Sequence, residues 1–456
     1  MPKTLRSLVH LISFIMAFAS LACHAQAQTP IPAGPLLVGP IRFEFAIYYP
    51  ALPAKQPIAQ LKERIRVGAG VLKLVTSMPD KPPTGAILVA TLNTTAQKNY
   101  RPPDLQMVQR FGRGLTRDQA ESLQRAEQAL ILEFAHPASM SASALRTALQ
   151  LAEQVARDTN GLLWDEETRE IFTPDEWHKR RLDSWSGDTP DVLQHTVIHA
   201  YKSDKLVRAI TLGMTKFGLP DIVVSDFSWS SNRPVGNLIN LFAQAMVEGE
   251  VIKMAGTYDL NIRSLRNTNV RQTQLATLKP NAAAIAKLSL VKGTWEDGDP
   301  RNRLVEIRFD RYPGPDHYAR QEAMLSALFG SEDSIQRVKH TNELLEASKA
   351  ASVKLPALRE AFKRGLAPGE YIQVKAPFAT LDGGNEWMWV EVTSWEGDAI
   401  TGLLKNEPAS IPSLHGGQMV KVSQGKVFDY IRHSADGRDE GNETGKILRR
   451  LQDAKR

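Results

Sequence analysis

Four side chains near the C-terminal end have the types that bind or cleave sugars and peptides. Two are carboxylates, Glu386 and Asp429, and the others are the indole of Trp389 and the amide of Asn406. Two carboxylates that flank a cleft carry out glycoside hydrolysis, and an indole provides a flat platform for a sugar or peptide. The same residue types also shape turns in small β domains. Binding, catalysis and a purely structural role are therefore all open, and we favour the structural interpretation over catalysis.

Other candidate sites are weaker in their spacing. His195 and His199 are four residues apart and could share a metal ion, but two ligands do not complete a zinc site, and no Glu follows the first His as the metalloprotease motif requires. The acidic residues at 165–170 and 436–443 lack calcium-loop spacing and are interpreted as solvated turns. No nucleophile elbow or phosphate loop is present. The sequence thus predicts no metal and no cofactor.

The N-terminal segment has the pattern of a secretory signal peptide. Two basic residues precede an apolar run over residues 8–21, and Ala25-Gln26-Ala27 supplies small residues for cleavage after Ala27. The run is shorter than the roughly 20 residues that span a bilayer. Lipidation at Cys23 is the alternative, although Ser20 stands where a lipobox has Leu. We expect a periplasmic or secreted protein, with no transmembrane segment after signal cleavage.

Cleavage would leave a chain with no thiol, because Cys23 is the single cysteine. A mature protein without cysteine can form no disulfide and no cysteine-ligated metal site. The formal charge of +6 falls to +4 when Lys3 and Arg6 are removed, since residues 1–27 contain no acidic residue. The densest basic groups, 179–181 and 449–450, are interpreted as solvated helix faces or ends. Without a basic stripe interleaved with aromatic residues, we expect no nucleic-acid partner.

The rest of the chain is predicted to be α+β, with two ferredoxin-like units followed by a small antiparallel β-rich domain. The order strand, helix, strand, strand occurs from about Ile41 and again from about Ala129. The openings Phe43-Glu-Phe and Leu132-Glu-Phe are similar. We therefore predict a signal peptide, two α+β units, a mixed or helical connecting region and a C-terminal domain, with the boundaries 1–27, 28–115, 120–250, 251–354 and 355–456.

The C-terminal domain has alternating strands separated by short turns. Residues 371–375, 386–394, 399–405, 418–423 and 426–431 are each predicted to be strands. On the strand at 386–394, Met388 and Val390 share one face and Trp387 and Trp389 share the other. The four candidate residues all lie in or beside these strands.

An ordered set of residues in this domain resembles the YegJ-like domain of unknown function, DUF2314. The resemblance covers about the last fifth of the chain and rests on Glu386, Trp389-Val390, Gly402, Leu404, Asn406, Pro408, Gly417, Val420, Asp429-Tyr430, Gly441 and Thr444. Tyr430 stands where the family more often has Trp. The resemblance implies a compact domain attached to other bacterial modules. It implies no reaction, so no catalytic role is transferred.

These observations predict an exported bacterial protein that binds an unknown protein or a cell-envelope ligand without catalysing a reaction. The alternative is a hydrolase of cell-wall sugar or peptide that uses Glu386 and Asp429.

Overall fold

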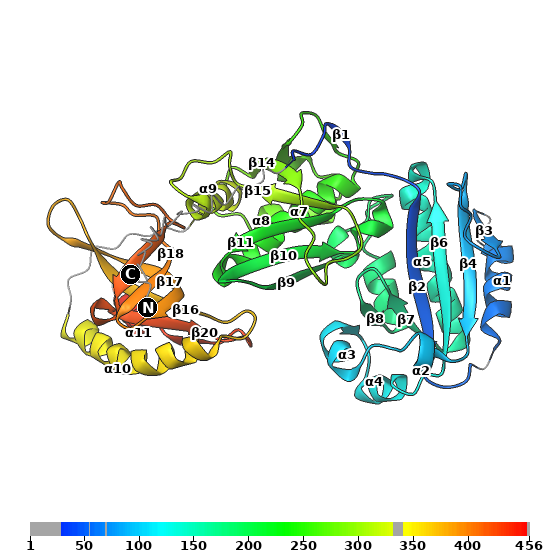
Figure 1. Cartoon of the computed structure of the whole chain (residues 1–456), viewed down its shortest axis with the longest axis horizontal. Coiled ribbons are helices and arrows are strands. Elements are labelled where there is room, and N and C mark those ends of the chain that lie inside the picture. Colours follow the sequence, from blue (N-terminus) through cyan, green and yellow to red (C-terminus); the bar gives the residue numbers. More distant parts are fainter. Residues whose placement is uncertain (1–28, 54, 69–70, 332–340, 454–456) are drawn as a thin grey trace, which may run out of the picture.

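The computed structural model describes residues 29–53, 55–68, 71–331 and 341–453. The predicted signal peptide and Cys23 lie outside these residues. Three large sheets follow one another along the long axis of the molecule, with the N-terminal sheet at one end and the C-terminal sheet at the other (Figure 1). The predicted α+β class is confirmed, because helices pack on sheets whose strands are mostly antiparallel.

The first sheet has seven strands in the order β3-β4-β6-β2-β7-β8-β5. Helices α1 (Pro57–Gly68) and α5 (Ser141–Thr159) contact each other beside it, while α2, α3 and α4 contribute Ala96, Val108 and Leu123 to a separate cluster. The strands are β2 (Ile41–Tyr49), β3 (Leu72–Val75), β4 (Ala86–Asn93), β5 (Gly112–Arg113), β6 (Gln128–His136), β7 (Leu162–Asp165) and β8 (Glu170–Phe172), and the short helices are α2 (Ala96–Asn99), α3 (Leu105–Phe111) and α4 (Arg117–Leu123).

The two repeats seen in the sequence form one ferredoxin-like sheet, so the boundary placed between residues 115 and 120 does not separate two units. The halves β2-α1-β4 and β6-α5-β7 interleave in the order β4-β6-β2-β7. Their similar openings pair directly with each other, with Phe43 opposite Phe134 and Phe45 opposite Leu132. Each half alone would leave a long strand edge unpaired, and the interleaving removes both edges.

The second sheet has six strands in the order β13-β14-β15-β11-β10-β9. Three of them come from residues 257–308, so the predicted connecting region is largely part of this sheet. Within this region, expected to be mixed or helical, residues 285–292 instead form a strand with alternating burial. The elements are β9 (Val197–Ser203), β10 (Leu206–Leu212), β11 (Asp221–Phe227), β13 (Thr257–Asn261), β14 (Ile285–Lys292), β15 (Leu304–Arg308), α7 (Asn232–Val247), α8 (Thr268–Ala276) and α9 (His317–Phe329).

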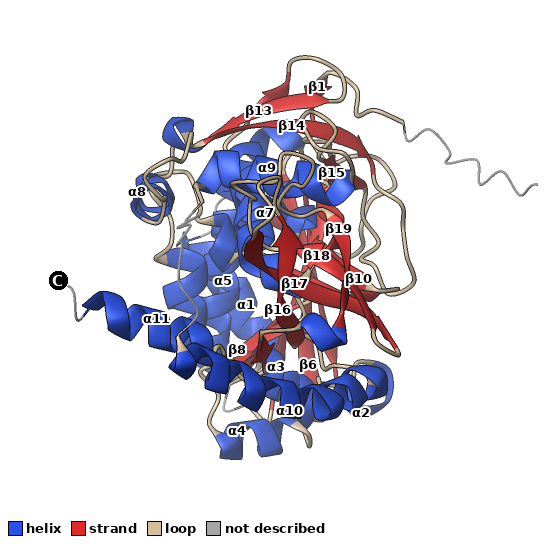
Figure 2. Cartoon of the chain, turned by 90° about the vertical axis from the view of Figure 1, so that its left-hand side faces the viewer, coloured by secondary structure: helices blue, strands red, loops and turns tan. Residues whose placement is uncertain are grey.

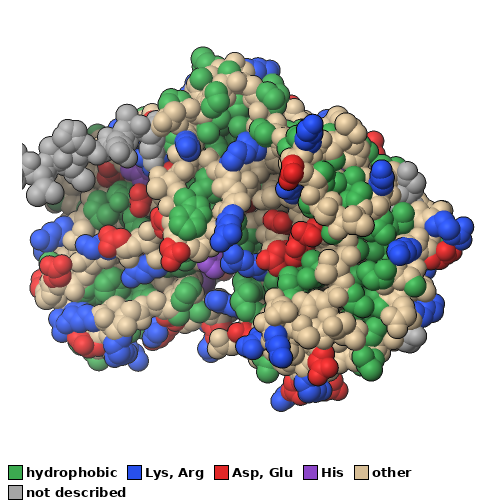
Figure 3. All heavy atoms as spheres, turned by 45° about the vertical axis from the view of Figure 1, so that its right-hand side comes forward, with side chains coloured by type: hydrophobic (Ala, Val, Ile, Leu, Met, Phe, Trp, Pro, Cys, Tyr) green, Lys and Arg blue, Asp and Glu red, His purple; other side chains and the backbone are tan. Residues whose placement is uncertain are grey.

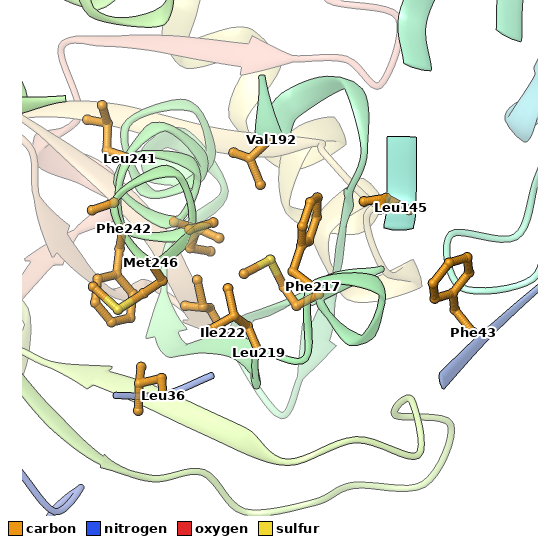
Figure 4. Packing of buried hydrophobic residues seen from close by; sticks show 14 of the residues in the cluster. Leu36, Phe43, Leu145, Val192, Phe217, Leu219, Ile222, Leu241, Phe242 and Met246 are labelled. Atoms are coloured by element: carbon orange, nitrogen blue, oxygen red, sulfur yellow. The ribbon is translucent and has the colours of Figure 1, made fainter. Parts of the chain in front are cut away.

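The first two sheets share one hydrophobic core. Phe43 and Leu145 of the first sheet's layer belong to the same buried cluster as Phe217, Ile222 and Phe242 of the second (Figure 4).

We call residues 29–331 the body. Short elements complete it, namely β1 (Gly34–Pro35), β12 (Val251–Ile252), α6 (Pro174–Trp177), a π-helical turn η2 (His178–Leu182), and the 3-10 turns η1 (Ala138–Met140), η3 (Val192–Gln194), η4 (Met214–Phe217), η5 (Trp229–Ser231) and η6 (Ile262–Ser264).

The third sheet, in the order β19-β18-β17-β16-β20-β21, belongs to the C-terminal domain and has its own core. Helix α10 contributes Leu355 and Leu358 to that core and lies beside α11 (Figure 2). Helix α10 begins at Asn342, so it crosses the boundary that was placed between residues 354 and 355. The elements are α10 (Asn342–Arg364), β16 (Tyr371–Ala379), β17 (Asn385–Glu396), β18 (Ala399–Leu404), β19 (Met419–Ser423), η7 (Gln424–Lys426), β20 (Asp429–His433), β21 (Asp439–Gly441) and α11 (Glu443–Asp453).

Among the helices in these described ranges, none has the combined length and hydropathy needed to cross a bilayer.

Candidate functional site

Glu386 and Asn406 both fasten the loop that follows β18. The carboxylate of Glu386 accepts hydrogen bonds from the backbone N–H groups of Ala409 and Ser410, at 2.9 and 3.1 Å. The side-chain oxygen of Asn406 accepts one from the backbone N–H of Trp389, at 2.7 Å. These contacts tie the loop to β17, so both side chains have a clear structural role.

Asp429 fastens the start of helix α11. Its side chain is fully buried and accepts hydrogen bonds from the backbone N–H of Thr444, at 2.9 Å, and from the Thr444 hydroxyl. The backbone N–H of Tyr430 donates to the other carboxylate oxygen. A carboxylate at a helix N-terminus satisfies N–H groups that have no partner within the helix and interacts favourably with the helix dipole.

Lys375, which the sequence analysis did not single out, lies between two of the candidates. It is opposite Trp389 on one neighbouring strand and opposite Asp429 on the other. Its ammonium group lies 5.6 Å from the centre of the Trp389 ring. Burial lowers the pKa of Lys375, and the Asp429 carboxylate opposes that shift. Trp389, Lys375 and Asp429 therefore form one row across the sheet.

Glu386 does not join this row. It pairs with Phe378, three positions along β16 from Lys375, and alternation places it on the other face of the sheet. Two strand spacings and three residues of strand put the Cα atoms of Glu386 and Asp429 about 14 Å apart. Catalytic carboxylates of glycosidases have carboxyl groups about 5–9.5 Å apart. The structure thus brings Trp389 near Asp429 and Asn406, but it does not bring the two carboxylates together.

A second group of polar residues joins the C-terminal domain to the body. We call Ser228, Ser230 and Ser231, at the start of α7, the serine clasp. Ser230 donates from its hydroxyl and its backbone N–H to Glu391 of β17. Lys405 donates to Ser228 and Ser231, at 3.4 and 3.2 Å. The three hydroxyls also contact one another. A continuous polar chain therefore runs from Lys405 through the clasp to Glu391.

The family glycine Gly417 is also at this junction. Its φ is +83°, and a Cβ there would meet the backbone carbonyl of Tyr318 in the body. Nearby, the backbone N–H of Met419 donates to Asp316 of the body at 3.4 Å. Glycine at this position allows the two backbones to approach closely.

A cavity of about 130 Å³ lies beside the clasp, between the two parts of the protein. Glu391, which is 4% exposed, contributes to one wall. Burial, followed by the Glu391 charge, raises the pKa of Tyr371 to about 12. The residues of the wall that carry polar or aromatic groups include Lys202, Lys205, Trp229, Tyr371, Glu391 and Thr393.

A third polar group is buried inside the body. Asp165 accepts hydrogen bonds from Lys216, at 2.5 Å, and from Arg181, at 3.0 Å. Arg181 also donates to Glu170 and Thr168. Burial opposes ionisation of Asp165, but the two cations outweigh it and lower its pKa. This buried network connects the β7–β8 hairpin of the first sheet to η4 beside the second.

The network corrects two interpretations of the sequence. The acidic residues at 165–170 were expected to be a solvated hairpin tip, and 179–181 a solvated helix face. Glu166 and Lys179 are exposed as expected, whereas Asp165, Glu170 and Arg181 are at most 4% exposed. The hairpin turns inward because the body brings Lys216 and Arg181 to it.

On the face displayed in Figure 3, exposed Lys and Arg are interspersed with Asp and Glu.

His195 and His199 have different surroundings. His195 is fully buried, contacts the rings of Trp185 and Phe217, and has a pKa well below its usual value because of burial. His199 lies exposed on β9. Across the described ranges, no group of three or more His, Cys, Asp or Glu side chains could hold a metal ion.

Stability is expected to fall as pH rises from 6.5 to 8, owing to Glu167. Burial and the neighbouring Asp165 charge raise the pKa of Glu167 to about 8. Between its unfolded value of 4.5 and 8, the folded state holds a proton that the unfolded state has lost, so the unfolding free energy decreases with pH. Buried histidines have lowered pKa values, so they make the unfolding free energy increase with pH, but only below about pH 6.5. Urea midpoints at the two pH values measure the difference.

Glu167→Gln is the matched variant for that measurement. It should flatten the pH dependence above 6.5, because the amide does not titrate. His178 also has a raised pKa, from its hydrogen bond to Glu153, and leaves a smaller residual slope of the same sign. An unchanged slope in Glu167→Gln would assign the effect to other groups.

Sequence reasoning missed Lys375, Glu391, Lys405 and the serine clasp. Glu391 carries a weak signal, since it stands between Val390 and Val392 in the middle of the strand. Its partner Ser230 is 161 positions away in the sequence, and no local pattern connects them.

Comparison with known proteins identifies the C-terminal domain. Residues 339–454 match a family described as an uncharacterized protein conserved in bacteria, DUF2314. The match begins just before α10 and confirms the resemblance noted in the sequence. Neither a curated protein nor a solved structure matches the chain. The protein is thus a two-sheet α+β body followed by a C-terminal domain that matches the DUF2314 family.

Proposed function

We propose that this is an exported bacterial protein that binds a ligand at the junction between its body and its C-terminal domain, without catalysing a reaction. The observation that carries this proposal is the junction cavity, to which both parts contribute side chains and in which Glu391 is buried. Cavities between domains with a few convergent polar groups are common ligand sites.

Export rests on the sequence of the first 27 residues, with its basic start, short apolar run and cleavage pattern. The proposed location is the periplasm or the exterior, where the partner would be a cell-envelope ligand or another exported protein. Cleavage after Ala27 is proposed in preference to lipidation at Cys23.

The contacts of Glu386 and Asp429 favour binding over hydrolysis. Each carboxylate already accepts two hydrogen bonds from a loop or helix end. General acid–base catalysis needs a carboxyl group within reach of the bond that it cleaves. We therefore do not propose the hydrolase function.

The experiment is to express the full-length gene product in its bacterial host, purify the protein from the periplasm, and measure its mass with any bound ligand by native mass spectrometry. We expect a mature chain that begins at Gln28 and a bound small molecule that is retained by wild type and lost from Glu391→Gln. Glu396→Gln, an exposed position on the same strand, is the control. Retention in the cytoplasm with residues 1–27 intact would contradict export, and a chain that carries no small molecule would contradict the binding site.

A further inference from the structure

We infer that the junction cavity binds a small zwitterion, a free amino acid, with its ammonium group at Glu391 and its carboxylate at Lys202 and Lys205. This inference rests on the proposed binding function and adds the chemical class of the ligand.

The ammonium end is assigned by the unbalanced charge of Glu391. Its carboxylate is 4% exposed, and its hydrogen bonds come from the hydroxyl and backbone N–H of Ser230, which are neutral donors. In the described part of the chain, no Lys, Arg or His forms an ion pair with it. A buried carboxylate is costly unless it is paired with a cation. A ligand ammonium would supply the missing charge and additional donors.

Glu370, the other acidic residue of the cavity wall, is already engaged. It accepts a hydrogen bond from the backbone N–H of Ala367 at 3.0 Å and lies 3.7 Å from Arg432. The ammonium group of Lys405 donates to Ser228 and Ser231. In the described residues Glu370 is thus paired with Arg432, and Lys405 reaches Glu391 only through the serine hydroxyls and forms no ion pair with it.

The carboxylate end is assigned by Lys202 and Lys205. Lys202 lies near the end of β9 and Lys205 in the turn that follows it, and both line the cavity from the body, whereas Glu391 lines it from the C-terminal domain. Both are exposed, and within the residues that the structure describes neither forms an ion pair. Two free ammonium groups at one wall attract an anion, and the opposite charges of the two walls select a molecule that carries both.

The size of the cavity limits the ligand to a small molecule. A volume of about 130 Å³ holds several water molecules, or one small organic molecule. Trp229, Phe362 and Leu366 supply an apolar part of the wall, which would receive a small apolar side chain.

The test is titration of the purified mature chain with each of the common amino acids, followed by calorimetry and by tryptophan fluorescence. Trp229 in the cavity wall gives the optical signal. For the amino acid that binds best, the N-acetyl derivative lacks the ammonium charge and the methyl ester lacks the carboxylate. Each is expected to bind at least about tenfold more weakly, which corresponds to the loss of about 1.4 kcal/mol.

Variants assign the two ends to residues. Glu391→Gln should weaken binding of the free amino acid about tenfold or more. The free amino acid should then bind this variant no more tightly than the N-acetyl form does. In the double variant Lys202→Met and Lys205→Met, the free amino acid should bind no more tightly than its methyl ester. Glu396→Gln and Lys421→Met are the exposed controls. Ser230→Ala breaks the contact with the body but keeps the carboxylate, so it should retain the preference for an ammonium group.

The outcomes separate this inference from the proposed function. If no free amino acid binds at millimolar concentration while another small molecule co-purifies with the protein, the ligand class is wrong and the binding function stands. If nothing binds in either experiment, both fail. Equal affinity for the acid, the ester and the N-acetyl form would also overturn the inference, because neither charge would be recognised.

Discussion

Asp165→Ala is expected to destabilise the body by about 3–5 kcal/mol, the usual cost of removing one partner from a buried ion pair. Asp165 is the carboxylate that accepts from Lys216, and both side chains are fully buried. The variant would leave Lys216 without its counter-ion, while Arg181 would keep Glu170. Urea unfolding of the full chain, followed by circular dichroism, measures the loss.

The pH dependence provides a second readout. An unpaired Lys216 would have its pKa lowered further by burial, so the folded variant would hold fewer protons than the unfolded one and would become more stable as pH rises. Asp188→Ala removes an exposed acid and should change stability by less than about 0.5 kcal/mol. Adding Lys216→Met to an Asp165→Leu chain should recover much of the loss.

An Asp165→Ala chain as stable as wild type would contradict the network. It would mean that Lys216 reaches water or another acceptor in the folded protein. A double variant no better than Asp165→Leu alone would show that the loss comes from altered packing.

Asp429→Asn is expected to destabilise the C-terminal domain by about 1.5–3 kcal/mol, the range for hydrogen bonds to a charged group. One carboxylate oxygen accepts from Thr444, and the other accepts from Tyr430. An amide provides only one oxygen, so its N–H₂ group must face a donor. Hydrogen exchange of residues 443–453 should accelerate, because the first turn of α11 loses its acceptor.

Thr444→Val is the matched control, since it removes the hydroxyl but keeps the backbone N–H bond to Asp429. It should show a smaller acceleration at the same helix. Wild-type protection of α11 in Asp429→Asn, together with loss of function in cells, would instead place Asp429 in a chemical role. Because the body and the C-terminal domain have separate cores, a single unfolding free energy is not expected to describe both.

The C-terminal domain was predicted well because its signals are local. The alternating strands at 386–394 and 399–405 and the turns between them pair with near neighbours in the sequence. Loop length and alternation set the register of such hairpins. The family motif could be recognised for the same reason, since Asn406 and Pro408 follow a strand that pairs with the one bearing Trp389.

The body was predicted less well because its pairings are not local. The repeat at Phe43 and Leu132 was visible in the sequence, but whether the two repeats form one sheet or two depends on which strands pair. The structure pairs the repeats with each other in one sheet. Residues 257–308 were left as a connecting region because the strands there complete a sheet that begins 60 residues earlier, at Val197.

The sequence alone determined the class of the chain, the family of its last domain and the residues that shape that domain. Glu386, Asn406 and Asp429 act on nearby backbone groups, so residue type and spacing were sufficient to favour their structural role. Only the tertiary structure decided which charges are buried and paired. Asp165 meets Lys216 across 51 positions, and Glu391 meets Ser230 across 161. Such pairs depend on how sheets pack, and their energies depend on exclusion of water, which no local sequence pattern specifies.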